Sequence, residues 1–91
     1  MKHATIDDLF EINTLIGNIR TMKNINEKSQ GHFYYKGKNV LHFHIENSII
    51  YADIGNTRII VENNVDCFNR IIDNTKEYIN EIDKLQYNKQ G

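Results

Sequence analysis

The sequence predicts an α+β domain: a two-layer sandwich in which a helix, a four-stranded antiparallel meander and a second helix follow one another along the chain. A helical pattern opens the sequence, short alternating segments separated by turn residues occupy its middle, and a second helical pattern closes it. Each helix and the sheet have one apolar side, and packing both helices on one sheet face buries all three sides.

Size and composition restrict the class of protein. With 91 residues, the chain is long enough for one hydrophobic core and too short for two, so residues 1–91 are expected to form a single domain. The 40% apolar and 25% charged shares are typical of globular proteins, and the net charge of −1 gives no broad field for nucleic acid. No apolar run is long enough to span a membrane, and the start, Met1 to Asp8, lacks the apolar core of a signal peptide. We therefore expect a cytoplasmic protein with no membrane partner.

The first helix is predicted from Thr5 to Met22. Thr5 is a suitable N-cap, and Asp7 and Asp8 suit the positive end of the helix dipole. Apolar residues then recur at steps of three and four: Ile6, Leu9, Phe10, Ile12, Leu15, Ile16, Ile19 and Met22. The polar stretch that follows, 23–31, predicts a loop.

Four strands are predicted between the helices, with three turns separating them. The strand ranges are 32–36, 40–46, 49–54 and 57–62. Asn47-Ser48 and Gly55-Asn56 are each expected to form a two-residue turn, and Gly37-Lys38-Asn39 a three-residue loop.

The register of the central hairpin follows from a turn at Asn47-Ser48. One face then consists of apolar pairs: Ile45 against Ile50, Phe43 against Ala52 and Leu41 against Ile54. The opposite, open face pairs His42 with Asp53, His44 with Tyr51 and Glu46 with Ile49. In the outer strands the core face receives Phe33, Tyr35, Ile59 and Val61, and the open face His32, Tyr34, Lys36, Arg58, Ile60 and Glu62. A slip by one residue would mix the two sets, so the pattern specifies the register.

The second helix is predicted to begin at a cap formed by Asn64 or Asp66. Its apolar stripe consists of Phe68, Ile71, Ile72, Thr75, Tyr78, Ile79, Ile82 and Leu85. Cys67 is the only cysteine, which excludes an internal disulfide, and its place at the apolar start of the helix is typical of a small core residue. The first few residues of the chain and residues 86–91 are expected to fray.

The open face of the predicted sheet gathers a candidate binding face: Tyr34, His42, His44, Tyr51, Asp53 and Arg58. His42 and His44 lie two apart on a strand and therefore point the same way, so with Asp53 they form a candidate divalent-metal site, to which His32 is a further neighbour. An ordinary polar pair between His42 and Asp53 is the simpler alternative. Asp53 can also orient His42 as a general base, but a flat sheet face lacks a water-poor pocket, and no catalytic residue is assigned.

The sequence favours a non-enzymatic binding or assembly module that uses this open face. Two alternatives stay open: a metal-binding or acid–base enzyme site at His42, His44 and Asp53, and a nucleic-acid-binding sheet surface. The carboxylates on the same face and the lack of an RNP-like motif count against nucleic acid. No cofactor is predicted apart from a divalent metal at that site. Unpaired sheet edges, together with Tyr34, Tyr51 and Ile60 on the open face, predict a homodimer.

One hairpin of the sequence resembles a known group of proteins. The stretch F-Y-Y-K-G-K-N-V-L-H-F-H at 33–44, followed by Y-A-D-I at 51–54, is similar to the small uncharacterised proteins called luciferase-like, whose hairpin carries L-H-F-H and then A-D. The chain lacks the tryptophan and the later histidine of some members. The resemblance brings no activity with it and implies only that His42, His44 and Asp53 have a role.

Overall fold

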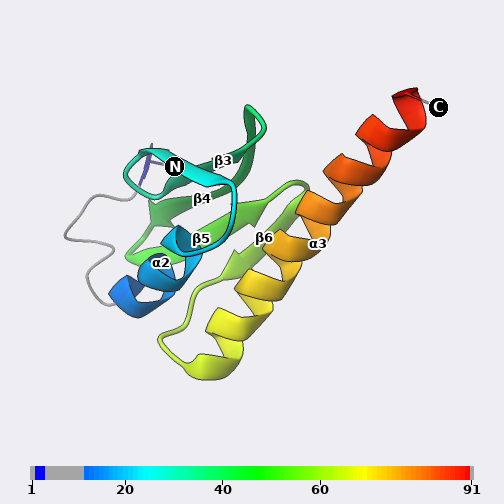
Figure 1. The fold of residues 1–91 in the computed structure, drawn as a ribbon. Coiled ribbons are helices and arrows are strands. Elements are labelled where there is room, and N and C mark those ends of the chain that lie inside the picture. Colours follow the sequence, from blue (N-terminus) through cyan, green and yellow to red (C-terminus); the bar gives the residue numbers. More distant parts are fainter. Residues whose placement is uncertain (1, 4–11, 91) are drawn as a thin grey trace.

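The computed structural model describes residues 2–3 and 12–90, and it has the predicted α+β fold (Figure 1). Within these residues, two helices pack against an antiparallel sheet. In chain order the elements are β1 (Lys2–His3), α2 (Asn13–Arg20), β2 (Ile25–Ser29), β3 (His32–Tyr35), β4 (Lys38–Glu46), β5 (Ile49–Ile54), β6 (Thr57–Ile60) and α3 (Val65–Gln90).

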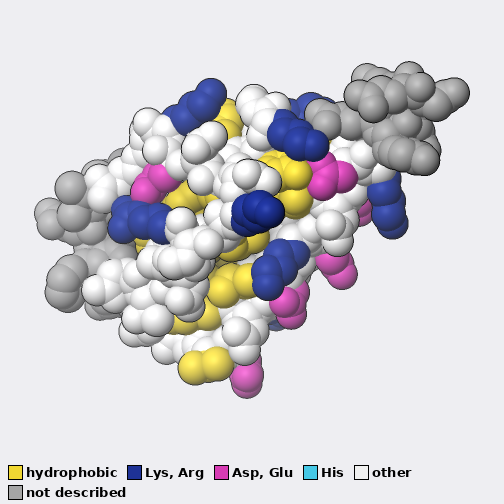
Figure 2. All heavy atoms as spheres, in the orientation of Figure 1, with side chains coloured by type: hydrophobic (Ala, Val, Ile, Leu, Met, Phe, Trp, Pro, Cys, Tyr) yellow, Lys and Arg dark blue, Asp and Glu magenta, His cyan; other side chains and the backbone are white. Residues whose placement is uncertain are grey.

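The sheet is a meander of five strands, in the order β2-β3-β4-β5-β6, with β1 pairing separately with β4. The prediction of four strands is therefore too low. A single buried cluster joins α2, α3 and the core face of the sheet, so both helices cover the same face; its members include Leu15, Ile19, Phe33, Phe43, Ala52, Ile59 and Ile71. Figure 2 shows hydrophobic side chains still visible on this face, because the two helices do not close over all of it.

The central hairpin has the predicted register. Asn47 and Ser48 form its turn with φ of 51° and 65°, the left-handed conformations that tight hairpin turns require. Phe43 pairs with Ala52 toward the core, and His42 pairs with Asp53 on the other face. The next turn, at Gly55-Asn56, is also confirmed, although β6 ends at Ile60 and not at residue 62.

The predicted three-residue loop Gly37-Lys38-Asn39 is wrong. The strands are joined by a two-residue turn at Lys36 and Gly37, with φ of 50° and 81°, and β4 already begins at Lys38. The odd residue is taken up inside the strand as a β-bulge, since Tyr34 pairs with Asn39 while Phe33 pairs with Leu41. Val40 and Leu41 are consequently both buried although they are neighbours. The bulge restores the predicted faces of β3, with Phe33 and Tyr35 in the core.

The predicted loop over 23–31 contains a strand, β2, which pairs with β3. Only Ile25 in this strand is a large apolar residue, so no alternating pattern marks it. Backbone pairing with β3 holds it, together with a charge pair to α2: Arg20 Nε lies 2.6 Å from Glu27 Oε1, and Glu27 Oε2 accepts a hydrogen bond from the Gly31 amide at 3.0 Å. The predicted start of the first helix, at Thr5, lies outside the described residues, and α2 ends at Arg20, short of Met22.

The long helix α3 begins at a side-chain cap and is attached to the sheet near its other end. Asn64 is its cap, because Asn64 Oδ1 accepts a hydrogen bond from the Cys67 amide at 2.8 Å. Toward the other end, Asp83 accepts hydrogen bonds from the Tyr35 hydroxyl at 2.9 Å and from Lys36 Nζ at 3.0 Å. The helix continues to Gln90, past the predicted apolar stripe. Neither helix among the described residues is long and apolar enough to cross a membrane.

Adjacent isoleucines in β6 provide a test of the sheet's two faces. Ile59 is 3% exposed and Ile60 is 53% exposed. We expect Ile59→Asp to lower the free energy of unfolding by about 3 kcal/mol or more, because it buries an unpaired charge, and Ile60→Asp to change it by less than about 1 kcal/mol. Urea unfolding followed by circular dichroism measures both. Equal losses for the two variants would contradict the assignment of faces.

Candidate metal centre

The open face of the sheet brings together side chains from three adjacent strands. β4 supplies His42 and His44, β5 supplies Asp53 opposite His42, and β6 supplies Arg58 opposite Asp53. Their neighbours Phe43 and Ala52 point to the core, so the alternation of the strands sends these four polar side chains to the same side. These are four of the six residues in the predicted binding face, and Tyr51, which pairs with His44 as predicted, is a fifth.

Asp53 is at the centre of this group. Its Oδ2 lies 2.8 Å from His44 Nε2 and 3.5 Å from His42 Nε2. One ligand atom from each of His42, His44 and Asp53 can be chosen so that all three lie within 4.8 Å of one another. We call these three residues the His–Asp cluster. The Asp53 and His44 side chains are 13% and 14% exposed and that of His42 is 29% exposed, so the cluster is accessible mainly from the His42 side.

Arg58 holds the Asp53 carboxylate from the side away from the histidines. Its Nε donates to Asp53 Oδ1 at 2.7 Å and its Nη2 donates to Oδ2 at 3.0 Å. Two parallel hydrogen bonds of this kind fix the plane of the carboxylate. A carboxylate oxygen accepts more than one hydrogen bond, so Oδ2 still faces the two histidines.

Asn39 fixes the proton on His42. His42 Nδ1 lies 2.8 Å from Oδ1, the side-chain amide oxygen of Asn39. An amide oxygen only accepts hydrogen bonds, so Nδ1 carries the proton and donates it. The other ring nitrogen, Nε2, faces Asp53. The bulge at Val40 is what turns Asn39 to the open face beside His42, so the sequence prediction that placed Asn39 in a loop missed this residue. Two consecutive apolar residues, Val40 and Leu41, were the available signal.

Aromatic rings surround the cluster. The His32 ring stacks on His42 with centroids 5.6 Å apart, and the His42 and His44 rings meet edge to face at 4.4 Å. Tyr51 lies beneath Arg58, whose guanidinium carbon is 5.7 Å from the ring centroid. Tyr34 stands further out, on β3, with Lys28 Nζ 4.6 Å from its ring centroid. The predicted face therefore divides into a polar cluster and a tyrosine on either flank.

The electrostatics of the cluster keep Asp53 ionised. Burial raises the pKa of Asp53, but the hydrogen bond and charge of Arg58, with smaller contributions from His44 and His42, outweigh burial and leave the pKa below its ordinary value of 3.8. The hydrogen bond to Asp53 likewise raises the pKa of Arg58. An ionised carboxylate beside two imidazole nitrogens is a donor set for a divalent transition metal.

Comparisons with protein-family models, with curated proteins and with solved structures found no match to this chain. The resemblance to luciferase-like proteins therefore stays a prediction from the sequence. Function has to be inferred from the geometry of the chain itself.

The lowered pKa of Asp53 gives a pH dependence with a definite sign. As the pH falls below 3.8, the carboxyl of the unfolded chain takes up a proton before that of the folded chain, so acid favours unfolding. The stabilisation from Asp53 is complete above pH 3.8 and is lost as the pH falls through the lower, folded-state pKa. We expect Asp53→Asn to be less stable than the wild type at neutral pH and to lose less stability on acidification.

Urea unfolding at a series of pH values measures this difference. Asp73→Asn serves as the matched control, because Asp73 is an exposed carboxylate on α3 with no ion pair among the described residues. The free energy of unfolding of this control should depend on pH in the same way as that of the wild type. If Asp53→Asn retained the wild-type pH dependence as well, Asp53 would not be the strongly paired carboxylate described above.

Proposed function

We propose that this domain is a metal-binding module, with a divalent ion of the zinc class held on its open face by Nε2 of His42, Nε2 of His44 and the carboxylate of Asp53. Bonds of about 2.0–2.1 Å in a tetrahedral arrangement place ligand atoms roughly 3.3 Å apart. The distances of 2.8 Å and 3.5 Å from Asp53 Oδ2 to the two Nε2 atoms are close to this separation. Three protein ligands leave a fourth position open to water or to a bound molecule.

The observation that carries the proposal is the hydrogen bond from His42 to Asn39. Because Nδ1 carries the proton that Asn39 Oδ1 accepts, a neutral His42 presents a lone pair on Nε2 to the carboxylate oxygen 3.5 Å away. Two acceptors facing each other repel unless a cation lies between them. A second proton on the ring, bound to Nε2, removes this repulsion, and so does a metal ion between the two atoms. Donation from the remote ring nitrogen to a carbonyl oxygen is the usual support of a metal-bound histidine.

Arg58 acts as a positioning residue for this site. Its two hydrogen bonds hold the carboxylate plane, and they leave Oδ2 directed at the histidines. The guanidinium charge also repels a bound cation, so we expect a weaker site than a structural zinc site made of thiolates. A moderate affinity is suited to reversible binding.

Zinc titration of the metal-free protein, followed by calorimetry and by the histidine ring signals in NMR, tests the proposal. Removing one of three ligands with His42→Ala, His44→Ala or Asp53→Asn should weaken binding by at least about 100-fold. His32→Ala is the matched control, because His32 stacks on His42 but is outside the His–Asp cluster. It should stay within about threefold of the wild type.

Two further measurements distinguish a preorganised metal site from adventitious zinc binding by surface histidines. Asn39→Ala leaves all three ligands in place but removes the acceptor for His42 Nδ1, so we expect about tenfold weaker binding. Where a second proton on the His42 ring lies between Nε2 and Asp53, zinc takes its place, so binding should release protons and strengthen as the pH rises. Equal zinc affinity in the wild type, His44→Ala and Asp53→Asn would refute the proposal.

A second candidate function is self-association through the open face. Ile60 pairs with Tyr51 across β5 and β6, Ile49 lies two residues before Tyr51 on β5, and the two isoleucines are 53% and 41% exposed. An exposed apolar strip beside a polar cluster is typical of an association surface, which supports the homodimer predicted from the sequence. Nucleic acid is less well supported, because the Asp53 and Glu46 carboxylates occupy the same face.

Light scattering over a dilution series distinguishes a dimer from a monomer of 10.7 kDa. We expect a doubled mass at high micromolar concentration, and its loss in Ile60→Lys, because the strip then carries a charge in each copy. Lys84→Glu, on the exposed side of α3, should leave the mass doubled. A wild-type mass of 10.7 kDa at the highest concentration would exclude the dimer.

A further inference from the structure

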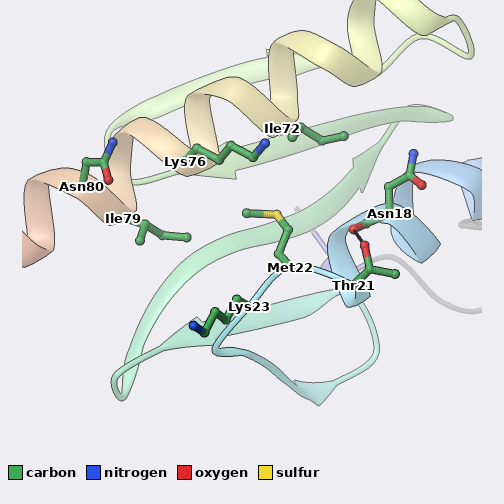
Figure 3. Close-up of a pocket in the computed structure, with 8 residues that line it drawn as sticks. All are labelled: Asn18, Thr21, Met22, Lys23, Ile72, Lys76, Ile79 and Asn80. Carbon is green, nitrogen blue, oxygen red and sulfur yellow. Dashed lines mark hydrogen bonds between the residues drawn. The ribbon is translucent and has the colours of Figure 1, made fainter.

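A groove runs between α2 and α3, on the sheet face opposite the His–Asp cluster (Figure 3). Its volume is about 650 Å³, within the range of sites that bind small molecules. The lining residues are Asn18, Thr21, Met22, Lys23, Ile72, Lys76, Ile79 and Asn80. Neither the sequence patterns nor the proposed metal site assigns a role to these residues together.

The floor of the groove is apolar and continuous with the core. Met22, Ile72 and Ile79 are partly buried, and all three pack against the buried cluster. Figure 3 shows Met22 reaching up from the segment that links α2 to β2, with Ile72 of α3 above it and Ile79 of α3 to its left. The groove lies where α2 ends, at Arg20, while the longer α3 continues beside the segment that follows.

The rim of the groove is positive. Lys23 and Lys76 are exposed, none of the eight lining residues is acidic, and among the described residues neither lysine has an ion pair. Arg20, the other cation at the end of α2, is already bound to Glu27 at 2.6 Å. Uncharged hydrogen-bonding groups complete the rim at Asn18, Thr21 and Asn80. In a chain of net charge −1, this groove thus has two lysines and no acidic residue in its lining.

We propose that this groove binds an amphipathic carboxylate, such as a medium-chain fatty acid. The apolar chain of the ligand lies along Met22, Ile72 and Ile79, where it removes exposed apolar surface from water. Its carboxylate accepts hydrogen bonds from the ammonium groups of Lys23 and Lys76 at the rim. The site is independent of the metal site, because the sheet separates the two.

Titration of the full chain with decanoate, followed by methyl signals in NMR, tests the inference. Decanoate should shift the signals of Met22, Ile72 and Ile79, while acetate, which lacks the chain, should not. Decan-1-ol, which lacks the charge, should bind several-fold more weakly than decanoate. The double variant Lys23→Gln, Lys76→Gln should weaken decanoate binding about fivefold and leave decan-1-ol binding unchanged.

The matched control is Lys28→Gln, Lys38→Gln, which removes two exposed lysines that do not line the groove and should change decanoate affinity by less than about twofold. Zinc or His44→Ala should not alter decanoate binding, so failure of the metal proposal leaves this one intact. Equal losses in the two double variants, equal binding of decanoate and decan-1-ol, or shifts confined to residues outside the groove would overturn it.

Discussion

The pairing register of β4 with β5 is the constraint on which the rest of the structure depends. It places Phe43 and Ala52 in the core and His42 and Asp53 on the open face, and a shift by one residue would exchange the two sets. The core therefore protects the site: any slip that separated the histidines from Asp53 would also expose the phenylalanine. Hydrophobic burial at one face supplies the free energy that holds the Asp53 carboxylate, the two histidines and Arg58 together at the other.

The parts of the fold that the sequence predicts are those governed by alternation of apolar and polar residues. The central hairpin has such alternation on both strands, and its turn at Asn47-Ser48 leaves one consistent register. Strand β2 has no such alternation. It is held by backbone pairing with β3 and by the pair between Arg20 and Glu27, and contacts between a helix and a polar edge strand leave no periodic signal.

The same distinction applies to the site. His42, His44, Asp53 and Arg58 were predictable because cross-strand neighbours follow from register alone. Asn39 was missed, because both a bulge and a longer loop can accommodate the odd residue, and the adjacent apolar pair Val40 and Leu41 was the one signal that favoured the bulge. The groove between the helices depends on where two helices end relative to each other, which local patterns do not encode.

The attachment of Asp83 to Tyr35 and Lys36 also has a consequence for how the chain folds. It joins positions 48 and 47 residues apart, one near the far end of α3 and the other at the tip of the β3–β4 hairpin. Closing so large a loop costs chain entropy, and the contact forms only when the helix and the sheet are both in place. Because the two layers also share one buried cluster, we expect neither of them to be stable alone. Unfolding should accordingly be a single cooperative event, in which the hairpin tip, the bulge beside it and the helical wall of the groove are lost together.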